Sequence, residues 1–259
     1  MPPTPLFIEP QWPAPASIMA LCTTRGGGCS SAPYRSFNLA AHVGDVPGSV
    51  DSNRGLLQAA LPARTAVQWL SQVHGITAAR ATGEPASPEA DACYSFQPGI
   101  ACAVLTADCL PVLFCSRDGN AVAAAHAGWR GLLAGVLEST VEALAQDPGQ
   151  IMAWLGPAIG PRAFEVGPEV REAYLSAADR ATEAPTAACF RSHPTHDGHC
   201  FADLYALARM RLHALGTTQV YGGGLCTFTD ARRFFSYRRD GQTGRMASLI
   251  LIRPTQVHT

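Results

Sequence analysis

Residues 102–131, CAVLTADCLPVLFCSRDGNAVAAAHAGWRG, constrain the fold of this chain more than any other stretch. They contain three short apolar runs of the length typical of buried strands, separated by polar turns. The Arg-Asp-Gly-Asn turn at 117–120 favours a hairpin between the last two runs. We expect all three strands to be neighbours, because short connections keep consecutive strands adjacent. The apolar runs are residues 102–105, 111–115 and 121–125.

Polar side chains follow these strands at the points where α/β proteins tend to place their chemistry. Cys109 follows the first run and His126 follows the third, while His74 comes after another apolar run at 67–73. Two imidazoles and a thiolate that converge would form a three-ligand zinc set with a fourth position open for water. Taken alone, Cys109 or His126 is more typical of an inert buried side chain, since free cysteine is among the most buried residue types.

A second group of candidate ligands lies in the segment RSHPTHDGHC. It contains His193, His196 and His199 together with Cys200. The segment is polar, includes proline and glycine, and has no flanking pattern that would fix a coordination geometry. We interpret it as a solvated loop.

The charge of the chain restricts the chemistry that it can support. Its net charge is −1, which argues against a nucleic-acid-binding face. All 19 basic residues are arginine, which excludes a Schiff-base lysine and a P-loop lysine. Arginine must therefore bind any phosphate. The nine cysteines form no CxxC pair, and neither a signal peptide nor a membrane-spanning run is evident, so we expect a cytoplasmic protein.

Strand and helix patterns interleave along the chain with no linker or repeat, which predicts a single α/β domain over residues 1–259. The proline-rich residues 1–16 are expected to form an extended arm on the surface. A helical stripe predicts one helix from Trp129 to Leu144. Further expectations are a strand at 67–73, a loop at 79–90 and irregular structure at 179–199.

Eight motifs occur in order across nearly the whole chain. They are TTRGGG, NLAAHVGD, WLSQVHG, VLTADCLPVLF, AAHAGWRGLLAG, WLGPAIGP, FEVGPEV and FFSYRRDGQTGRMA. Together they closely resemble the YfiH-type family, which was first described as laccase-like polyphenol oxidases and later as purine nucleoside phosphorylases with adenosine deaminase activity. The human protein FAMIN is a relative in this family. Segment 179–200 matches none of the motifs.

The resemblance implies a four-layer α/β/β/α sandwich with mixed sheets. It also implies that His74, Cys109 and His126 are zinc ligands and catalytic residues. The expected activity is phosphorolysis of adenosine, inosine or methylthioadenosine, together with deamination of adenosine. The expected partners are these small molecules and phosphate, with no nucleic acid or membrane, and the protein is expected to be a monomer or homodimer.

Several further residues are candidates for roles in this reaction. Asp108 could orient an imidazole or relay a proton, and it could equally cap its own turn. Arg130 begins a predicted helix, where a guanidinium and free backbone N–H groups favour phosphate. Arg25, Arg238 and Arg239 are additional phosphate candidates, although each is also compatible with a surface ion pair.

Three alternatives to the phosphorylase remain open at this stage. Cys109 with His126 or His74 could form the nucleophile–base pair of an amide hydrolase, which would suit the peptidoglycan precursor editing with which YfiH-type proteins have been connected. Two histidines and a cysteine also match a copper ligand set, so a laccase-like copper oxidase is a second alternative. The chain has eight histidines and no His-x-His pair, which disfavours a four-copper centre. A non-catalytic binding module is the third, and the polar strand ends argue against it.

Overall fold

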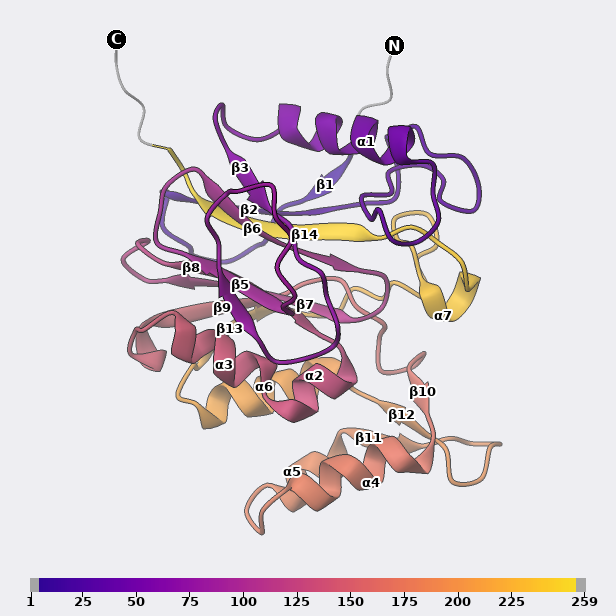
Figure 1. Ribbon diagram of the computed structural model, residues 1–259. Coiled ribbons are helices and arrows are strands. Elements are labelled where there is room, and N and C mark those ends of the chain that lie inside the picture. The colour runs from indigo at the N-terminus through magenta and orange to yellow at the C-terminus, as the bar shows by residue number, and fades with distance from the viewer. Residues whose placement is uncertain (1–4, 255–259) are drawn as a thin grey trace.

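Two mixed β-sheets stacked face to face form the centre of the molecule, with helices on both outer faces (Figure 1). The computed structural model describes residues 5–254. The resulting four layers, α/β/β/α, confirm the predicted sandwich. None of the helices in this described range is long and apolar enough to cross a membrane.

The first sheet has five strands in the order β1–β2–β14–β6–β3. All neighbours are antiparallel except β3 and β6, which are parallel. Helix α1 (Pro47–Ala59) covers its outer face, and Leu57 packs there in one cluster with Leu21 and Leu249. The strands are β1 (Phe7–Ile8), β2 (Ile18–Thr23), β3 (Ala66–Gln68), β6 (Ile100–Thr106) and β14 (Met246–Ile252).

The second sheet has six strands in the order β13–β9–β7–β8–β5–β4, with parallel pairs at its two edges and antiparallel pairs between them. Helices α2 (Trp129–Ala134), α3 (Val136–Ala143) and α6 (Leu204–Ala214) cover its outer face. The short 3-10 helix η1 (Pro148–Gln150) precedes β9. The strands are β4 (Ala78–Arg80), β5 (Ala92–Ser95), β7 (Leu110–Ser116), β8 (Val122–Ala127), β9 (Ile151–Leu155) and β13 (Gln219–Gly222).

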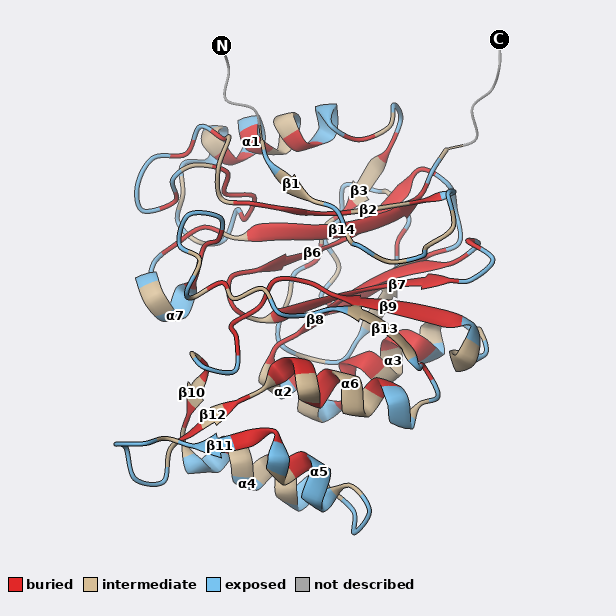
Figure 2. Ribbon diagram, turned by 180° about the vertical axis from the view of Figure 1, so that it is seen from behind, coloured by how far each residue is buried: buried red, intermediate tan, exposed pale blue. Residues whose placement is uncertain are grey.

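The central strands are buried along their whole length, as the red segments in Figure 2 show. Cys102, Leu113 and Ile250 belong to the cluster that fills the space between the sheets. A strand covered on both faces carries apolar residues on both, so its sequence reads as a continuous apolar run. This arrangement explains why the central strands are easy to recognise from sequence.

A smaller lobe, residues 165–202, protrudes from the side of the sandwich that carries α2, α3 and α6 (Figure 1). Tyr174 and Phe190 in the lobe belong to the same buried cluster as Leu132 of α2. The Tyr174 hydroxyl also donates a hydrogen bond to the carbonyl oxygen of Trp129 at 2.9 Å. The lobe is therefore continuous with the core of the main body. Its elements are β10 (Glu165–Val166), α4 (Pro168–Ala177), α5 (Glu183–Ala188), β11 (Phe190–Ser192) and β12 (Cys200–Ala202).

Several sequence predictions were wrong in detail. The stretch 179–199 is not wholly irregular, because α5 and β11 form there and bury one face each, with Thr186 and Phe190 inside. The helix expected from Trp129 to Leu144 is interrupted at Gly135, whose φ of 109° ends α2 and starts α3. Glycine adopts this left-handed conformation without steric cost.

The strand predicted at 67–73 ends at Gln68, and only an isolated bridge from Ser71 to Glu89 continues the pairing. The predicted loop at 79–90 begins with the end of β4. The proline-rich arm contributes an edge strand, β1, to the first sheet, while its residues 1–4 lie outside the described residues.

Candidate active site

Cys109 lies where the chain crosses from one sheet to the other. Strand β6 of the five-stranded sheet ends at Thr106, and β7 of the six-stranded sheet begins at Leu110. The first two predicted strands are thus consecutive but lie in different sheets, contrary to expectation. Their connection, only three residues long, includes Asp108 at a φ of 103°. This sharp crossing places Cys109 between the two sheets, where β6 ends and β7 begins.

The two histidines approach Cys109 from separate elements. His126 lies within β8, opposite Pro111 of β7, and not after the strand as the sequence suggested. His74 lies in the loop after β3, with a φ of 62°. The His74 and His126 rings meet edge to face, with centroids 4.8 Å apart and planes at 72°. The structure therefore brings together all three residues that the sequence analysis selected as zinc ligands.

The spacing of the three side chains suits a single metal ion. The Cys109 Sγ is 3.9 Å from the His74 Nε2, and one ligand atom from each of the three residues lies within 4.8 Å of the others. A tetrahedral zinc ion would hold sulfur and nitrogen ligands ~3.6 Å apart. A Cβ added at Gly128 would lie 3.0 Å from the Cys109 Sγ and 3.1 Å from the His74 Cδ2. Glycine at 128 thus keeps the space beside the ligands open.

Asp91, which precedes β5, orients both histidines. Its Oδ1 atom lies 2.8 Å from the His126 Nδ1, which leaves the Nε2 of that ring free to bind an ion. The same carboxylate accepts hydrogen bonds from the backbone N–H groups of Val73, His74 and Gly75, at 3.1, 3.0 and 2.6 Å. Metal-binding histidines commonly donate their second ring nitrogen to a carboxylate. Sequence reasoning missed Asp91, whose only indication was an acidic residue directly before a buried strand.

Asp108 has a different role from the one considered in the sequence analysis. Its carboxylate accepts hydrogen bonds from the Thr227 hydroxyl at 2.6 Å and the Ser236 hydroxyl at 3.0 Å. It also accepts one from the backbone N–H of Arg238, at the start of α7 (Tyr237–Asp240), at 2.7 Å. Among the described residues it makes no hydrogen bond to an imidazole. Asp108 anchors the segments that border the site, and Asp91 is the carboxylate that orients His126.

The thiol and the imidazole shift each other's protonation. Burial favours the neutral thiol of Cys109, but the positive charge of His126 and hydrogen bonds from His126 and His74 lower the pKa of Cys109 from 9.0 to about 6. Burial also disfavours the charged form of His126. The negative charges of Cys109 and Asp91 nevertheless raise the pKa of His126 from 6.5 to about 9. Without a metal, the pair is therefore a thiolate and an imidazolium near neutral pH.

This shift predicts an unusual pH dependence of alkylation. In metal-free enzyme we expect the rate of Cys109 modification by iodoacetamide to rise with pH and reach half of its maximum near pH 6. Because the pKa is lowered, about 90% of the thiol is ionised at pH 7, against about 1% for an ordinary thiol. Mass spectrometry of the modified peptide measures the rate, with the exposed Cys29 as internal reference. A half-maximum above pH 8 would contradict the prediction.

Two cavities meet at His74 and Cys109, and both also contact Tyr237. The first, of about 250 Å³, is the more apolar and has aromatic walls. The second, of about 360 Å³, extends toward the five-stranded sheet and is more polar. Beyond the shared residues, the first is lined chiefly by Trp129, Ile159, Phe164, Leu204, Arg130 and Arg238. The second is lined chiefly by His42, Gln72, Leu105, Thr106, His126 and Arg245.

Comparison with known proteins places the chain in a family. A family model described as "Multi-copper polyphenol oxidoreductase laccase" matches residues 19–253. This family includes proteins named YfiH. The chain belongs to the YfiH-type family. The family predicted from the eight motifs is thereby confirmed.

Relatives and solved structures of YfiH-type proteins resemble this chain over almost its entire length. Purine nucleoside phosphorylase YfiH of Escherichia coli (strain K12) is 56% identical over 247 residues, which cover 94% of this chain and 98% of the relative. Purine nucleoside phosphorylase PA4543 of Pseudomonas aeruginosa is 54% identical and covers 94% and 97%. The crystal structure of Neisseria meningitidis NMB0706 is 47% identical, with a TM-score of 0.88, and covers 96% and 99%. YlmD from Geobacillus stearothermophilus is 31% identical, with a TM-score of 0.83, and covers 92% and 93%.

Of the four arginines proposed for phosphate in this YfiH-type chain, two line the first cavity. Arg130 is exposed and stacks on Trp129, with its guanidinium carbon 4.3 Å from the ring centroid. Arg238 donates a hydrogen bond to the Glu165 carbonyl oxygen at 2.6 Å and lies over Phe164. Both side chains can therefore reach a ligand bound in that cavity.

The other two arginines are used to hold loops together. Arg25 donates to the carbonyl oxygens of Arg35 and Ala231. Arg239 forms a two-pronged ion pair with Asp240 and also donates to three backbone carbonyl oxygens. Neither lines one of the two cavities at Cys109. Sequence reasoning missed Arg245, which lines the second cavity.

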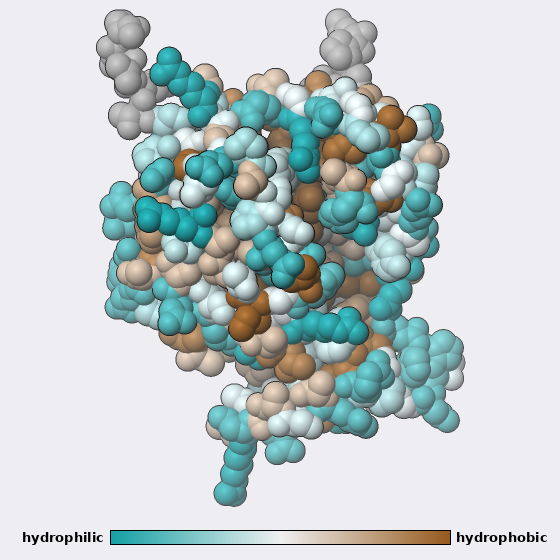
Figure 3. Space-filling view, viewed as in Figure 1, coloured by the Kyte–Doolittle hydropathy of each residue, from teal (hydrophilic) through white to brown (hydrophobic). Residues whose placement is uncertain are grey.

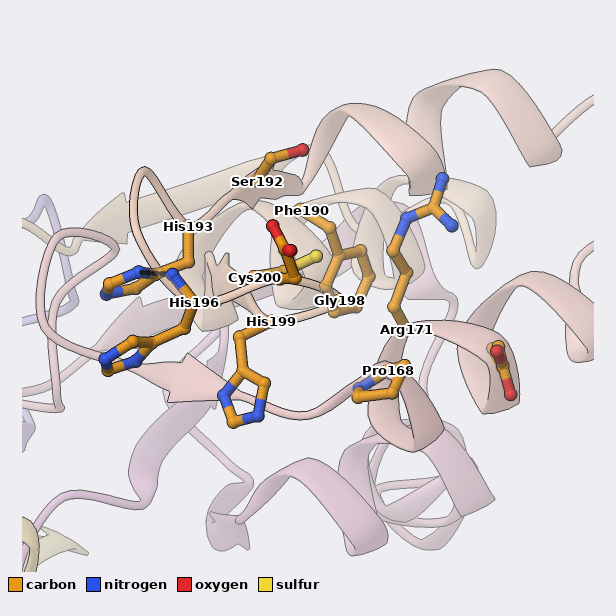
Figure 4. A pocket seen from close by; sticks show the side chains of 11 residues that line it. Pro168, Arg171, Phe190, Ser192, His193, His196, Gly198, His199 and Cys200 are labelled. Carbon is orange, nitrogen blue, oxygen red and sulfur yellow. Dashed lines mark hydrogen bonds between the residues drawn. The ribbon is translucent and has the colours of Figure 1, made fainter.

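The histidine-rich segment forms the loop between β11 and β12. Figure 4 shows His193, His196 and His199 in this loop. His196 is exposed, as expected of a solvated loop, but the histidine side chains are held near Glu165. The Glu165 Oε1 atom lies 2.7 Å from the His196 Nδ1 and 2.8 Å from the His199 Nδ1, and the Oε2 atom lies 3.7 Å from the His193 Nε2. Teal hydrophilic residues are prominent around this end of the lobe in Figure 3.

The geometry of this cluster is poorer for a metal than that at Cys109. The rings of His193 and His196 stack in parallel, with centroids 4.4 Å apart and planes 9° apart. Ring nitrogens in two parallel planes cannot both direct their in-plane lone pairs at one ion without ring rotation. The candidate ligand Cys200 is instead buried in β12. His196 and His199 are therefore hydrogen-bond partners of Glu165, and His193 lies at ion-pair distance from it.

Proposed function

We propose that this YfiH-type protein is a zinc-dependent purine nucleoside phosphorylase that cleaves adenosine, inosine or methylthioadenosine, with adenosine deamination as a second activity. The observation that carries the proposal is the position of the three candidate ligands between two cavities of different polarity. The names of the E. coli and P. aeruginosa relatives support the same reaction.

The two cavities suit the two halves of a phosphorolysis. Trp129, Phe164 and Tyr237 give the first cavity aromatic surface on which a purine can pack. The second cavity then lies across Cys109 from the base, where phosphate can approach the opposite face of the sugar. A phosphate oxygen bonds to C1′ as the bond from C1′ to N9 breaks. The electron pair of that bond passes to the purine, which takes up a proton, and the products are ribose 1-phosphate and the free base.

His74, Cys109 and His126 would hold the metal, with Asp91 fixing the orientation of His126. Bound zinc would supply a Lewis acid and lower the pKa of a coordinated water toward about 7. Copper also accepts two histidines and one cysteine, so the donor set alone does not separate the two metals. The chain's own contribution is to exclude water from the aromatic cavity and to hold base and phosphate at opposite sides of Cys109, with the sugar between them.

Deamination requires a different orientation of the substrate in the same site. Water must then attack C6 of adenine, so the base itself has to face the three ligands. The polar second cavity would accept the ribose in that orientation. Phosphate and ribose would then occupy the same cavity, so we expect phosphate to slow deamination.

A cysteine–histidine hydrolase is the second candidate, and one observation favours it. The Cys109 thiol, His126 and Asp91 form a nucleophile, a base and an orienting carboxylate, and the pKa of the thiol is lowered to about 6. Such a triad could cleave amide bonds in peptidoglycan precursors without any metal. The laccase-like alternative, suggested by the description of the family, has weaker support, because only two groups of three candidate ligands occur among residues 5–254.

Product analysis separates these possibilities. Zinc-loaded enzyme is incubated with adenosine in the presence and absence of phosphate, and the products are separated by chromatography. We expect adenine and ribose 1-phosphate only when phosphate is present. Inosine should form in both cases, and phosphate should convert part of it to hypoxanthine and ribose 1-phosphate. Absence of turnover with zinc, combined with amidase activity that is lost in Cys109→Ala, would favour the hydrolase instead.

We also propose that the reaction takes place in the cytoplasm. All nine cysteines are free in the structure, including Cys29 on the surface. Exposed thiols and a thiolate at the active site are stable in a reducing compartment. Cytoplasmic nucleosides and phosphate would then be available as substrates.

A further inference from the structure

Arg245 reaches the active site through the pairing of the last strand with β6. Met246 of β14 lies opposite Thr106 of β6, so Arg245 is next to the crossing that carries Cys109. Its side chain is only partly exposed and lines the second cavity. Tyr237, which both cavities share, lies beside it, with the guanidinium carbon 5.7 Å from the ring centroid. The position is therefore inside the site and not on its surface.

The Arg245 guanidinium is only partly satisfied within the described part of the chain. Its Nη1 atom donates to the carbonyl oxygens of Thr243 and Gly244, at 2.8 and 3.1 Å. Its Nε and Nη2 atoms have no hydrogen-bond partner among residues 5–254, and the arginine ion pairs found there are formed by Arg25, Arg211, Arg233 and Arg239. A guanidinium that lines a cavity and has two nitrogen atoms without a partner in the described residues is suited to binding an oxyanion.

Two further side chains that can donate hydrogen bonds, His42 and Arg54, lie near Arg245. His42 lines the same cavity, and both Arg245 and Arg54 lower the pKa of His42, after the larger effect of burial. Arg54 donates to the Leu39 carbonyl oxygen and stacks on Trp69, and it also lacks an ion-pair partner within 4.0 Å in the described residues. The positive charges of Arg245 and Arg54 both disfavour the charged form of His42, and a bound anion would offset this repulsion while the neutral imidazole can still donate one hydrogen bond.

The nearest negative groups leave the guanidinium available. Burial lowers the pKa of Arg245, and the negative charges of Cys109 and then Asp108 offset part of that shift through space. Cys109 makes no hydrogen bond to Arg245, and the Asp108 oxygens are occupied by Thr227, Ser236 and the Arg238 backbone. Gln72, also in the cavity wall, uses both ends of its amide on the backbone of Leu105. Arg245 is thus the strongest free hydrogen-bond donor in the second cavity.

We propose that Arg245, assisted by His42, binds the phosphate co-substrate in the second cavity. The ligand is inorganic orthophosphate or a close analogue such as arsenate. This inference rests on the proposed phosphorylase reaction, and it replaces Arg130, Arg25, Arg238 and Arg239 as the primary phosphate ligands. Phosphate held there lies across Cys109 from the aromatic cavity, which is the placement that displacement of a purine from C1′ requires.

The test measures phosphate binding and catalysis separately in zinc-loaded full-length enzyme. For Arg245→Gln we expect the KM for phosphate to rise about 10- to 100-fold, the loss typical of one charge-assisted contact, with the KM for inosine nearly unchanged. Arg245→Lys, which keeps the charge, should recover part of the affinity. Arg80→Gln removes the same charge at an exposed position at the end of β4 and serves as the matched control. His42→Asn should cause a smaller rise in the same KM.

Equilibrium dialysis with labelled orthophosphate distinguishes failure of this inference from failure of the proposed reaction. If phosphate binds and the binding depends on Arg245, but no ribose 1-phosphate forms, the anion site is supported and the phosphorylase reaction is rejected. Phosphorolysis by wild type with an unchanged phosphate KM in correctly folded Arg245→Gln would reject the anion site alone. Adenosine monophosphate is added as a competitor. The reference competitor is unlabelled orthophosphate together with adenosine. If adenosine monophosphate displaces the labelled orthophosphate at a much lower concentration than this reference, the cavity holds the 5′-phosphate of a nucleotide. The orthophosphate assignment is then wrong.

Discussion

Cys109→Ala is expected to lose tightly bound zinc and to cleave inosine at least about 100-fold more slowly than wild type. The thiolate is the only sulfur donor in the three-ligand set, and in the metal-free protein its negative charge raises the pKa of His126. Without the thiolate, two neutral imidazoles remain, and they bind zinc much more weakly than a set that includes a thiolate. Metal content by atomic emission and initial rates with inosine and phosphate measure the two effects.

Cys29→Ala is the matched control for this substitution, because Cys29 is exposed and lies near α1, where its thiol contacts Asn53. It should retain zinc and full activity. Full phosphorolysis by metal-free Cys109→Ala would show that neither the thiol nor the metal takes part. Loss of activity with full retention of zinc would instead indicate that Cys109 acts as a nucleophile, as in the hydrolase alternative.

The central fold was predictable because the buried strands carry continuous apolar runs. The hairpin of β7 and β8 follows from its Arg-Asp-Gly-Asn turn, which joins two of the apolar runs. The lobe was harder to predict. Its helix α5 and strand β11 bury only a few residues each, so their polar exposed faces dominate the sequence pattern. Gly135 divides the predicted helix into α2 and α3 although the apolar stripe is continuous. The spacing of apolar residues does not reveal that one residue adopts a left-handed conformation.

The residues of the candidate site also differ in whether local sequence or long-range contacts identify them. Cys109 and His126 could be selected because each stands beside an apolar strand. Asp91 bonds to a ring 35 residues away and to a loop 16 to 18 residues before it, and no local pattern encodes either contact. Arg245 reaches the site only because β14 pairs with β6. Such residues are found from sheet order, which a single sequence does not reveal.

Asp91→Asn is expected to produce the largest combined loss of stability and metal affinity in the molecule. Asp91 is fully buried, and its two oxygens accept hydrogen bonds only from N–H donors. If the asparagine oxygen faces His126, its NH₂ group meets the N–H donors of Val73 and Gly75. If the amide is reversed, the NH₂ group faces the His126 Nδ1, which moves the ring proton to Nε2 and blocks the atom that would bind zinc. Either orientation removes an essential interaction.

The pH dependence of stability follows from the same carboxylate. Burial favours the protonated form of Asp91, but hydrogen bonds from His126 and the backbone outweigh it, and the pKa of Asp91 falls below its ordinary value of 3.8. A carboxyl group with a pKa lowered by folding stabilises the protein above the ordinary pKa. That stabilisation is lost as pH falls below about 4. Asp91→Asn should therefore lie closer in stability to wild type in strong acid than at pH 7.

At pH 7 we expect Asp91→Asn to lower the free energy of unfolding by about 3 kcal/mol and the zinc affinity by about 10- to 100-fold. Urea denaturation of the metal-free proteins measures the first effect, and competition with a chelator measures the second. Asp51→Asn, an exposed position on α1, is the matched control and should change neither quantity. Equal zinc affinity in Asp91→Asn and wild type would mean that His126 needs no orienting carboxylate. The three-ligand geometry would then have to be maintained by the strands alone, through the crossing that carries Cys109 and the fixed position of His126 in β8.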